Sequence, residues 1–373
     1  MSGSVTTWSA EGPLLPRNLD FKKIFVAEDE TIHLIATKRI HIIGTLKVLR
    51  NNLRRGNNDL IFYTIMKPKF QPLFCVEVEG YSDTLFVATK KKLGFVENYR
   101  QLGERDSRVV SETISPRFQS DVETSDNLRY TGGSVDSKGR VWLMISEGKN
   151  SPGRLFHLDK DWKPSNRRYV SIRRFGGIGW SLDDKTIYIH EPARNDCIIA
   201  YDFNIETGII EMDKDRLFYE FKNPMEYPMA FVIDSEDHMW CAVAGTSRII
   251  RISPKSEVVG EIHLPPPHEP IDLQFVGNEL IILTKRIRRD EIFLMGGTSH
   301  KMLMNAKEAS HGNIFTVDTG YTGKPRHLYK LSLEELSLLK NSGLSLGDSL
   351  RTFIRGAVDF FSRFHESEAS RNA

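Results

Sequence analysis

Three ionisable side chains stand beside strand-like or turn-like segments where they could transfer protons. Glu11 begins the segment Glu11-Gly12-Pro13, His190 directly follows a β-branched and aromatic run, and Asp272 lies two residues after Pro270. A buried carboxyl group has a raised pKa and an imidazole titrates near neutral pH, so both can act as general acids or bases. We predict Glu11, His190 and Asp272 as catalytic residues. Each also has a structural interpretation: a solvated glutamate, a turn histidine and an aspartate that caps a turn.

The composition is that of a globular protein with little overall charge. The chain has 373 residues, of which 40% are apolar, and a formal net charge of +2. A near-neutral chain gives no reason to expect nucleic-acid binding by bulk electrostatics. No apolar run approaches the ~18 residues of a membrane-spanning helix, and the N-terminus shows no secretory leader. We expect a cytoplasmic protein with no nucleic-acid partner and no transmembrane segment.

Sequence motifs for several common chemistries are missing. The three cysteines, Cys75, Cys197 and Cys241, are widely spaced and form no C-x-x-C pair. This argues against a disulfide framework or a zinc knuckle. The chain has no G-x-S-x-G elbow, P-loop or dinucleotide fingerprint. Serine hydrolase, nucleotide-binding and NAD-dependent functions are therefore unsupported, and we predict no bound cofactor.

Short runs of β-branched and aromatic residues recur along the chain. Their spacing is about 40–60 residues, the range of the blades of a β-propeller. Most follow a polar turn with Asp, Asn or Gly, and each precedes a second strand-like segment, which is the pattern of a hairpin. The runs are Ile24-Phe25-Val26, Leu85-Phe86-Val87, Val141-Trp142-Leu143, Ile187-Tyr188-Ile189, Met239-Trp240-Cys241 and Ile281-Ile282-Leu283.

Six units of this kind predict an all-β fold, a six-bladed β-propeller over residues 1–330. A hairpin cannot bury both of its own faces, so repeated hairpins stack radially and share a core. A β-sandwich with extra strands is the alternative, but six units at this period are too many for one sandwich. We expect Trp180 and Trp240 in the cores of the blades.

Residues 331–373 are predicted to form a helical extension. Apolar side chains between Leu350 and Phe364 recur at helical spacing and form one stripe of an amphipathic C-terminal helix. The simplest interpretation is a helix packed on the outside or the end of the propeller. Contact with a membrane surface or a partner protein is the functional alternative.

Three segments resemble motifs of the regucalcin/gluconolactonase family of β-propellers. Residues 178–188 are similar to its N-G-(L/I)-x-W-S-x-D-x-K-x-x-Y segment and residues 133–142 to its D-G-x-x-D-x-x-G-R-x-(W/F) segment. Residues 231–240 resemble a third motif, D-G-(M/L)-x-x-D-x-x-G-x-(L/I)-W. The resemblance covers about residues 130–320. It implies a propeller with a ligand site at its centre.

Members of that family hold one divalent cation at the centre through Glu, Asn and Asp side chains, and a further Asn helps to hold substrate. Glu11 matches the family's Glu, whereas Gly176 replaces the Asn and Met229 replaces the Asp. Thr131 stands where the substrate-side Asn is expected. A hard divalent cation needs six or more oxygen ligands. The resemblance, with these replacements, therefore implies that no metal is bound.

The same replacements predict a wider and less polar pocket. Methionine and glycine leave a soft floor, which suits an apolar ligand with a few oxygen atoms better than a sugar lactone. By the same resemblance, His190 and Asp272 would lie close to the pocket. The residues predicted to bind substrate are Tyr130, Thr131, Gly176, Tyr227 and Met229.

These features predict a metal-independent enzyme that closes or opens a ring in an apolar, oxygenated small molecule by acid–base assistance. Such propellers resemble proteins encoded with fungal secondary-metabolite pathways, including the trichothecene sesquiterpenoid cluster. Two alternatives stay open. One is a metal-dependent lactonase or esterase with ligands rebuilt from Glu11, His190 and Asp272. The other is a non-catalytic propeller that binds a metabolite or a protein partner.

Overall fold

The fold consists almost entirely of β-strands, which confirms the predicted all-β class. In the part of the chain that the computed structural model describes, the strands form six separate sheets, and one helix, α1 (Leu46–Arg54), lies beside them. No helix in that part is long and apolar enough to cross a membrane. The described residues are 5–15, 21–36, 40–54, 63–64, 72–89, 93–97, 99, 129–146, 153–158, 168–169, 177–191, 194, 196–224, 226–265, 268–285 and 312–331.

The first three sheets follow one another along the chain. Sheet 1 contains β2 (Phe21–Val26), β3 (Ile32–Ala36), β4 (Ile40–Gly44) and β5 (Tyr63–Thr64). Sheet 2 contains β6 (Pro72–Val78), β7 (Tyr81–Thr89) and β8 (Leu93–Glu97). Sheet 3 contains β9 (Arg129–Val135), β10 (Val141–Ser146), β11 (Arg154–His157) and β12 (Arg168–Tyr169).

The last three sheets repeat this antiparallel meander. Sheet 4 contains β13 (Ile178–Trp180), β14 (Thr186–Glu191), β15 (Cys197–Asn204) and β16 (Ile209–Tyr219). Sheet 5 contains β17 (Tyr227–Ile233), β18 (Met239–Ala244), β19 (Arg248–Ile252) and β20 (Val258–His263), with β1 (Thr6–Ser9) parallel to β20 at its outer edge. Sheet 6 contains β21 (Glu269–Val276), β22 (Glu279–Lys285) and β23 (Ile314–Asp318).

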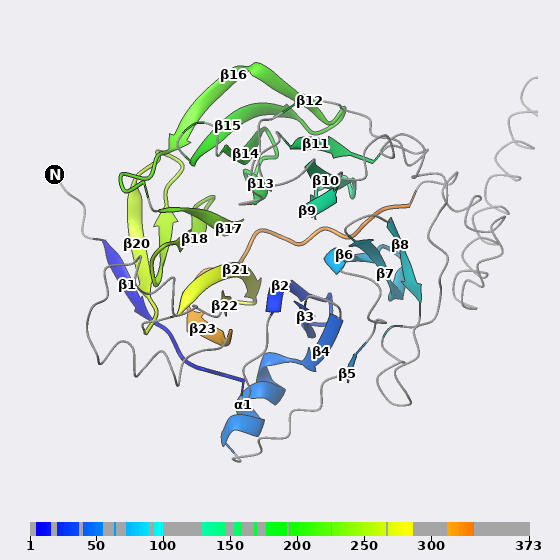
Figure 1. Ribbon diagram of the computed structural model, residues 1–373, viewed down its shortest axis with the longest axis vertical. Helices are drawn as coiled ribbons and strands as arrows, with labels where there is room; N and C mark the ends of the chain where they lie inside the picture. Colours follow the sequence, from blue (N-terminus) through cyan, green and yellow to red (C-terminus); the bar gives the residue numbers. More distant parts are fainter. Residues whose placement is uncertain are drawn as a thin grey trace, which may run out of the picture.

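The six sheets lie around a common centre (Figure 1). Their innermost strands are β2, β6, β9, β13, β17 and β21. Each innermost strand contacts the innermost strands of the two neighbouring sheets. Apolar clusters fill the spaces between adjacent sheets, as with Trp240, Leu273 and Phe275 between sheets 5 and 6. Side chains shared between radial sheets are the expected packing of hairpin units that cannot bury their own faces.

One polar turn is built in the same way in two sheets. In sheet 3, Asp136 Oδ1 accepts the backbone N–H groups two and four residues later, and its Oδ2 accepts Trp142 Nε1–H at 2.8 Å. In sheet 5, Asp234 repeats all three bonds, with Trp240 Nε1–H at 2.9 Å. Both aspartates and both tryptophans are fully buried. The repeat confirms that the Asp-containing turns mark equivalent places in the sheets and that Trp240 is a core residue.

The recurring apolar runs do not all occupy the same strand of their sheets. Five of them form the second strand of their sheets, whereas Ile24-Phe25-Val26 lies in the innermost strand β2. The true innermost strands of sheets 3 and 4 contain Gly132, Gly133 and Gly179 and pack close to the centre. Glycine weakens the sequence pattern of a strand, so these strands are less visible in the sequence than the β-branched strands that follow them.

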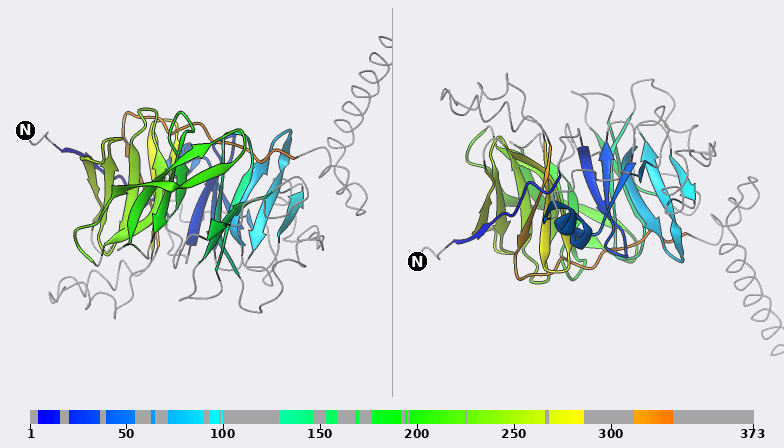
Figure 2. Two further views of the ribbon diagram at one scale, coloured as in Figure 1. Left: turned by 90° about the horizontal axis from the view of Figure 1, so that it is seen from above. Right: turned by 90° about the horizontal axis from the view of Figure 1, so that it is seen from below.

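A segment of irregular backbone, residues 319–331, crosses the centre of the ring on one face of the molecule; we call it the strap (Figures 1 and 2). It hydrogen-bonds to the first hairpin of every sheet. Its partners are the backbone carbonyls of Val26, Glu77, Gly139, Ser181, Ile233 and Asn278. The strap therefore covers one end of the space that the innermost strands surround.

Gly139 tests how tightly the strap packs on the turns. It has φ +79°, and an added Cβ would lie 2.7 Å from Lys330 Cβ. Gly139→Ala should lower the free energy of unfolding by about 2–4 kcal/mol, because left-handed backbone and overpacking each cost roughly 1–3 kcal/mol. Gly80→Ala is the matched control, with φ +78° and nothing within 4 Å of the added Cβ, and should cost only about 1–2 kcal/mol. Equal losses in urea unfolding would show that the strap does not pack there.

The predicted C-terminal helix between Leu350 and Phe364 lies outside the described residues, as does most of the predicted extension 331–373. Helix α1 was not anticipated from the sequence. It lies at the outer edge of sheets 1 and 6 (Figure 1), where Arg50 donates hydrogen bonds to Glu279 and Glu11.

Candidate functional site

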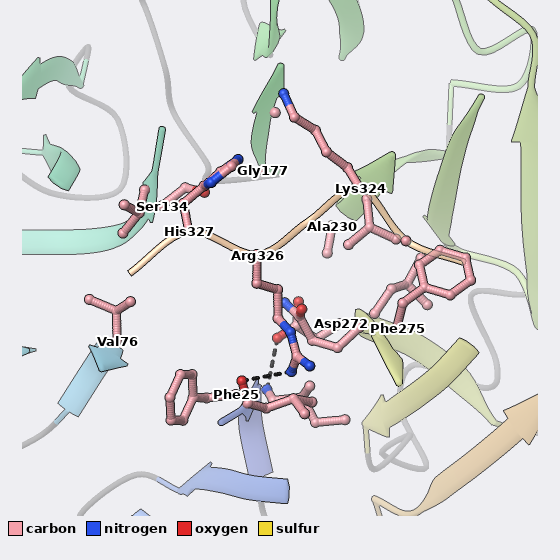
Figure 3. A pocket seen from close by; sticks show the side chains of 18 of the residues that line it. Phe25, Val76, Ser134, Gly177, Ala230, Asp272, Phe275, Lys324, Arg326 and His327 are labelled. Carbon is pink, nitrogen blue, oxygen red and sulfur yellow. Dashed lines mark hydrogen bonds between the residues drawn. The ribbon is translucent and has the colours of Figure 1, made fainter. Parts of the chain in front are cut away.

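A cavity of about 590 Å³ lies at the centre of the six sheets, and the strap forms one of its walls (Figure 3). All six innermost strands contribute to it. This volume is within the range of about 300–1,000 Å³ that is usual for small-molecule sites. The strand residues that line it are Lys23–Val26, Leu73–Glu77, Gly133–Val135, Ile178–Trp180, Ala230–Ile233 and Asp272–Phe275.

Asp272 is a buried acid of β21 that lines the cavity beside β2. Its Oδ2 accepts the backbone N–H of Ile24 at 2.8 Å, and its Oδ1 is 3.3 Å from Lys23 Nζ. Burial raises the pKa of Asp272, and the Lys23 ammonium opposes that rise. A carboxyl group with a raised pKa and a cation beside it is suited to proton transfer near neutral pH. Asp272 lines the cavity, and its catalytic role stays a prediction.

Two further acids, Glu28 and Glu77, line the cavity on the side of sheets 1 and 2. Glu77 is buried, and it accepts Tyr99 Oη–H at 2.7 Å and the backbone N–H of Glu28 at 2.6 Å. These bonds fix the carboxylate against the turn between β2 and β3. We therefore assign Glu77 a structural role and leave proton transfer to Asp272.

Three strap residues with basic side chains also line the cavity. Lys324 Nζ donates to Ser181 O at 2.7 Å and pairs with Asp184, so its charge is balanced by sheet 4. Arg326 extends across the cavity toward β2, where Nη1 donates to Val26 O at 2.9 Å (Figure 3). His327 lies near Ser134 and Gly177 (Figure 3). Burial, with a smaller effect of Lys324, lowers the pKa of His327, so its imidazole is neutral at physiological pH.

Aromatic and aliphatic side chains make up most of the rest of the wall. Phe25, Phe74, Phe231 and Phe275 come from four different sheets. Gly179 lets the ring of Phe231 pack closely beside it, because an added Cβ would lie 3.1 Å from that ring. The wall thus mixes apolar rings with charged groups, and Met229, one of the residues predicted to make a wider and less polar pocket, does not line it.

Glu11 is not at the centre, and its predicted position is wrong. The residue forms a β-bridge with Thr316 of β23, the outermost strand of sheet 6, and its side chain is 57% exposed in an ion pair with Arg50. The N-terminal segment adds to the outer edges of sheets 5 and 6, so Gly12 packs against Phe315. An E-G-P segment is short enough to match by chance, and the surrounding residues decide where it lies.

His190 is also outside the cavity, which corrects the prediction that it lies near the pocket mouth. It is buried in β14, the second strand of sheet 4, and its Nε2 is 3.2 Å from Asp196 Oδ1. The run that ends at Ile189 forms the second strand of sheet 4, and β13 occupies the innermost place. His190 therefore belongs to the interior of a sheet.

The four described residues among those predicted to bind substrate lie near the starts of β9 and β17, and none of them lines the cavity. Tyr130 is buried in the cluster between sheets 2 and 3, and Thr131 Oγ1 is 3.5 Å from Met144 O. Met229 packs against apolar clusters on both sides of β21, and Tyr227 is half-buried at the start of β17. Gly176 lies outside the described residues. The structure brings none of the described four together with Asp272.

Sequence reasoning missed Lys23, Arg326 and His327. A signal for Lys23 was present, because a lysine inside an apolar strand pattern must find a carboxylate or reach water. The run Lys324-Pro325-Arg326-His327 follows the last predicted strand, and nothing in its local pattern places it across the centre of a ring.

A hard divalent cation does not fit the described residues at the centre. No group of three or more His, Cys, Asp and Glu side chains in the described part of the chain is placed to hold a metal ion. Asp272 is the nearest equivalent of a ligand, and Lys23 already pairs with it. An ammonium at that position repels a cation, and one carboxylate cannot replace the oxygen shell that such an ion needs.

Comparison with known proteins identifies the family of this architecture. The family model for the SMP-30/gluconolactonase/LRE-like region matches residues 62–284, more than half of the chain. The chain belongs to the SMP-30/gluconolactonase family. This confirms the resemblance found from the sequence motifs.

Individual members show how distant the relationships are. The chain is 34% identical over 143 residues to an uncharacterized protein of Sulfolobus acidocaldarius, an alignment that covers 37% of this chain and 50% of the relative. It is 21% identical over 225 residues to lactonase drp35 of Staphylococcus haemolyticus, covering 58% of this chain and 65% of that protein. The chain thus spans half to two thirds of the length of these curated relatives.

A solved structure supports the family fold. Regucalcin of Agrobacterium tumefaciens, described as a calcium-binding protein, superimposes with a TM-score of 0.64 at 15% identity, covering 88% of this chain and all of that structure. At this identity the likeness shows the fold alone, which is that of a β-propeller. The narrower resemblance to fungal secondary-metabolite proteins stays a prediction.

Proposed function

We propose that this protein is a six-bladed β-propeller that hydrolyses lactones or esters with an apolar skeleton in its central cavity. The observation that carries the proposal is the Asp272–Lys23 pair, a buried carboxylate with a raised pKa in the central cavity of a lactonase-type family fold. Ring closure, the reaction favoured by the sequence alone, has no support from the relatives, and hydrolysis fits them better.

In the proposed reaction, Asp272 acts as general base. Its ionised carboxylate takes a proton from water as the water oxygen attacks the lactone carbonyl. The acyl C–O bond of the ring then breaks, and the leaving oxygen takes up a proton from Asp272 to become a hydroxyl group. The product is a hydroxy acid, which ionises to a carboxylate at neutral pH. Lys23 keeps Asp272 partly ionised between turnovers, because an opposite charge favours the charged form.

The phenylalanine side chains around the cavity indicate the kind of substrate. Phe25, Phe74, Phe231 and Phe275 offer no hydrogen bonds to the several hydroxyl groups of a sugar lactone. Burying a hydroxyl group without a partner costs roughly 1–3 kcal/mol in proteins. An aromatic or alicyclic lactone avoids this cost and gains apolar contact.

The expected substrate preference is therefore dihydrocoumarin over glucono-δ-lactone, by about tenfold or more in kcat/KM. Proton release at constant pH measures both reactions. Asp196→Asn is the control variant, because Asp196 lies beside His190 in sheet 4 and outside the cavity; it should retain wild-type rates. Equal or inverted preference would contradict the proposed substrate class.

The same assay tests whether hydrolysis requires a metal ion. Hydrolysis should persist after treatment with a chelator, since the described donors do not fit a divalent cation. Activity that is lost on chelation and restored by Ca²⁺ would instead support a metal-dependent lactonase. Binding of aromatic lactones without any turnover would support the non-catalytic alternative.

A further inference from the structure

The strap places a guanidinium group in the cavity that the described structure leaves largely without hydrogen-bond acceptors. Arg326 can donate five N–H groups, and in the described part of the chain it makes one hydrogen bond, from Nη1 to Val26 O at 2.9 Å. It forms no ion pair among those residues. Arg326 is exposed overall, and burial of part of its side chain lowers its pKa, an effect that the nearby carboxylates of Glu77 and of the turn after β2 oppose. The N–H groups of a guanidinium that lies in a cavity can bind an anionic ligand there.

The acids around Arg326 already have other bonding partners or lie too far away. Glu77 is bonded to Tyr99 and to the backbone N–H of Glu28, and Asp272 is held by Lys23 and Ile24. Glu28, Asp29 and Glu30, on the turn after β2, raise the pKa of Arg326 through space but make no ion pair with it. The remaining N–H groups are therefore available to a ligand.

A second observation indicates that the cavity suits a ligand with oxygen atoms. His327 is among the residues that line the cavity, and its Nε2 is shielded from solvent and has no hydrogen-bond partner in the described structure. Buried polar atoms are usually paired, and leaving one unpaired costs roughly 1–3 kcal/mol. Ser134, on the same wall as His327, adds a hydroxyl group (Figure 3).

We propose that Arg326 is the carboxylate anchor of the central cavity and that the ligands of this protein pair an apolar ring with a carboxylate. Guanidinium and carboxylate groups match in a planar, two-bond geometry that a lysine cannot provide. This inference rests on the proposed function for its chemistry, because every lactone that is opened produces a hydroxy acid whose carboxylate must be held and then released. The strap thereby acts as a specificity element as well as a cover.

Binding of an unreactive pair of probes tests the anchor without requiring catalysis. 3-Phenylpropanoate and 3-phenylpropanamide share one skeleton and differ in charge. Isothermal titration should show that the wild-type protein binds the carboxylate about 10- to 100-fold more tightly, the usual worth of a hydrogen bond to a charged group. Arg326→Gln should abolish the difference, and Arg326→Lys should keep part of it.

Arg216→Gln is the matched control, because Arg216 pairs with Asp202 on the exposed face of sheet 4; it should bind like the wild type. The glutamine side chain at 326 ends two bonds before the position of Nη1 and loses the hydrogen bond to Val26 O, so the melting temperature of each variant is measured to report whether the strap stays in place. An equal affinity of the wild type for both probes, no binding of either, or an unchanged preference in Arg326→Gln or Arg326→Lys would overturn the anchor. If carboxylate binding depends on Arg326 but the protein opens no lactone, the role of Arg326 is supported and the proposed hydrolase function is refuted.

Discussion

Asp272→Asn is expected to lower kcat for dihydrocoumarin hydrolysis by roughly 10²–10⁴-fold, the usual effect of losing a general base. Asparagine keeps the shape of the side chain and can still accept the backbone N–H of Ile24, so the fold and KM should change little. Steady-state kinetics of the purified variant, with Asp196→Asn as the carboxylate control outside the cavity, provides the measurement. A variant with the wild-type kcat would show that Asp272 is not the base.

The pH profile should carry the same signature. A base must be ionised to act, and burial raises the pKa of Asp272 above that of an ordinary aspartate. Activity should therefore rise with pH through a value above the usual ~3.9. Lys23→Met removes the charge that opposes this rise and should move the acid limb to higher pH. If the acid limb of the profile does not move in Lys23→Met, Lys23 does not influence the ionisation of the catalytic base.

Asp234→Ala is expected to lower the free energy of unfolding by about 3–5 kcal/mol, the usual cost of breaking a buried ion pair by removing one partner. Asp234 accepts hydrogen bonds from Trp240, from Arg251 and from two backbone N–H groups of its own turn. Its loss leaves Arg251, which is only 5% exposed, with the partly exposed Glu236 as its remaining partner. Urea unfolding measures the change.

Asp202→Ala supplies the comparison, because Asp202 pairs with Arg216 at the surface and its side chain is 42% exposed. Its effect should stay within about 0.5 kcal/mol. Similar losses for Asp234→Ala and Asp202→Ala would mean that the buried turn does not stabilise sheet 5. Asp136→Ala, at the equivalent turn of sheet 3, should be as harmful as Asp234→Ala.

Local sequence patterns were sufficient to predict the second strands of five sheets and the family. The β-branched runs mark strands because they fit a half-buried pleated surface, and the Asp-containing turns mark hairpins because the aspartate bonds to its own backbone. Asp136 and Asp234 show this in the same bonds in two sheets. These are interactions between neighbours in the chain, which is why they can be recognised without the fold.

The candidate site depends on residues that are distant in the chain, and most of it was not predictable. Asp272 and Lys23 are 249 positions apart, and Arg326 reaches Val26 across 300 positions. Glu11 and His190 were assigned by short motif matches, but their places are decided by which strand lies innermost and which edge the N-terminal segment joins. The strap has no periodic pattern at all, so only its contacts with all six hairpins reveal its role.

The most direct test of the account is a crystal structure of the protein with 3-(2-hydroxyphenyl)propanoate, the product of dihydrocoumarin hydrolysis. We expect this ligand to lie in the central cavity, with its ring among the phenylalanines and its carboxylate between Asp272 and Arg326 of the strap. A product bound elsewhere on the molecule, or held at the centre by a metal ion and not by Arg326, would contradict it.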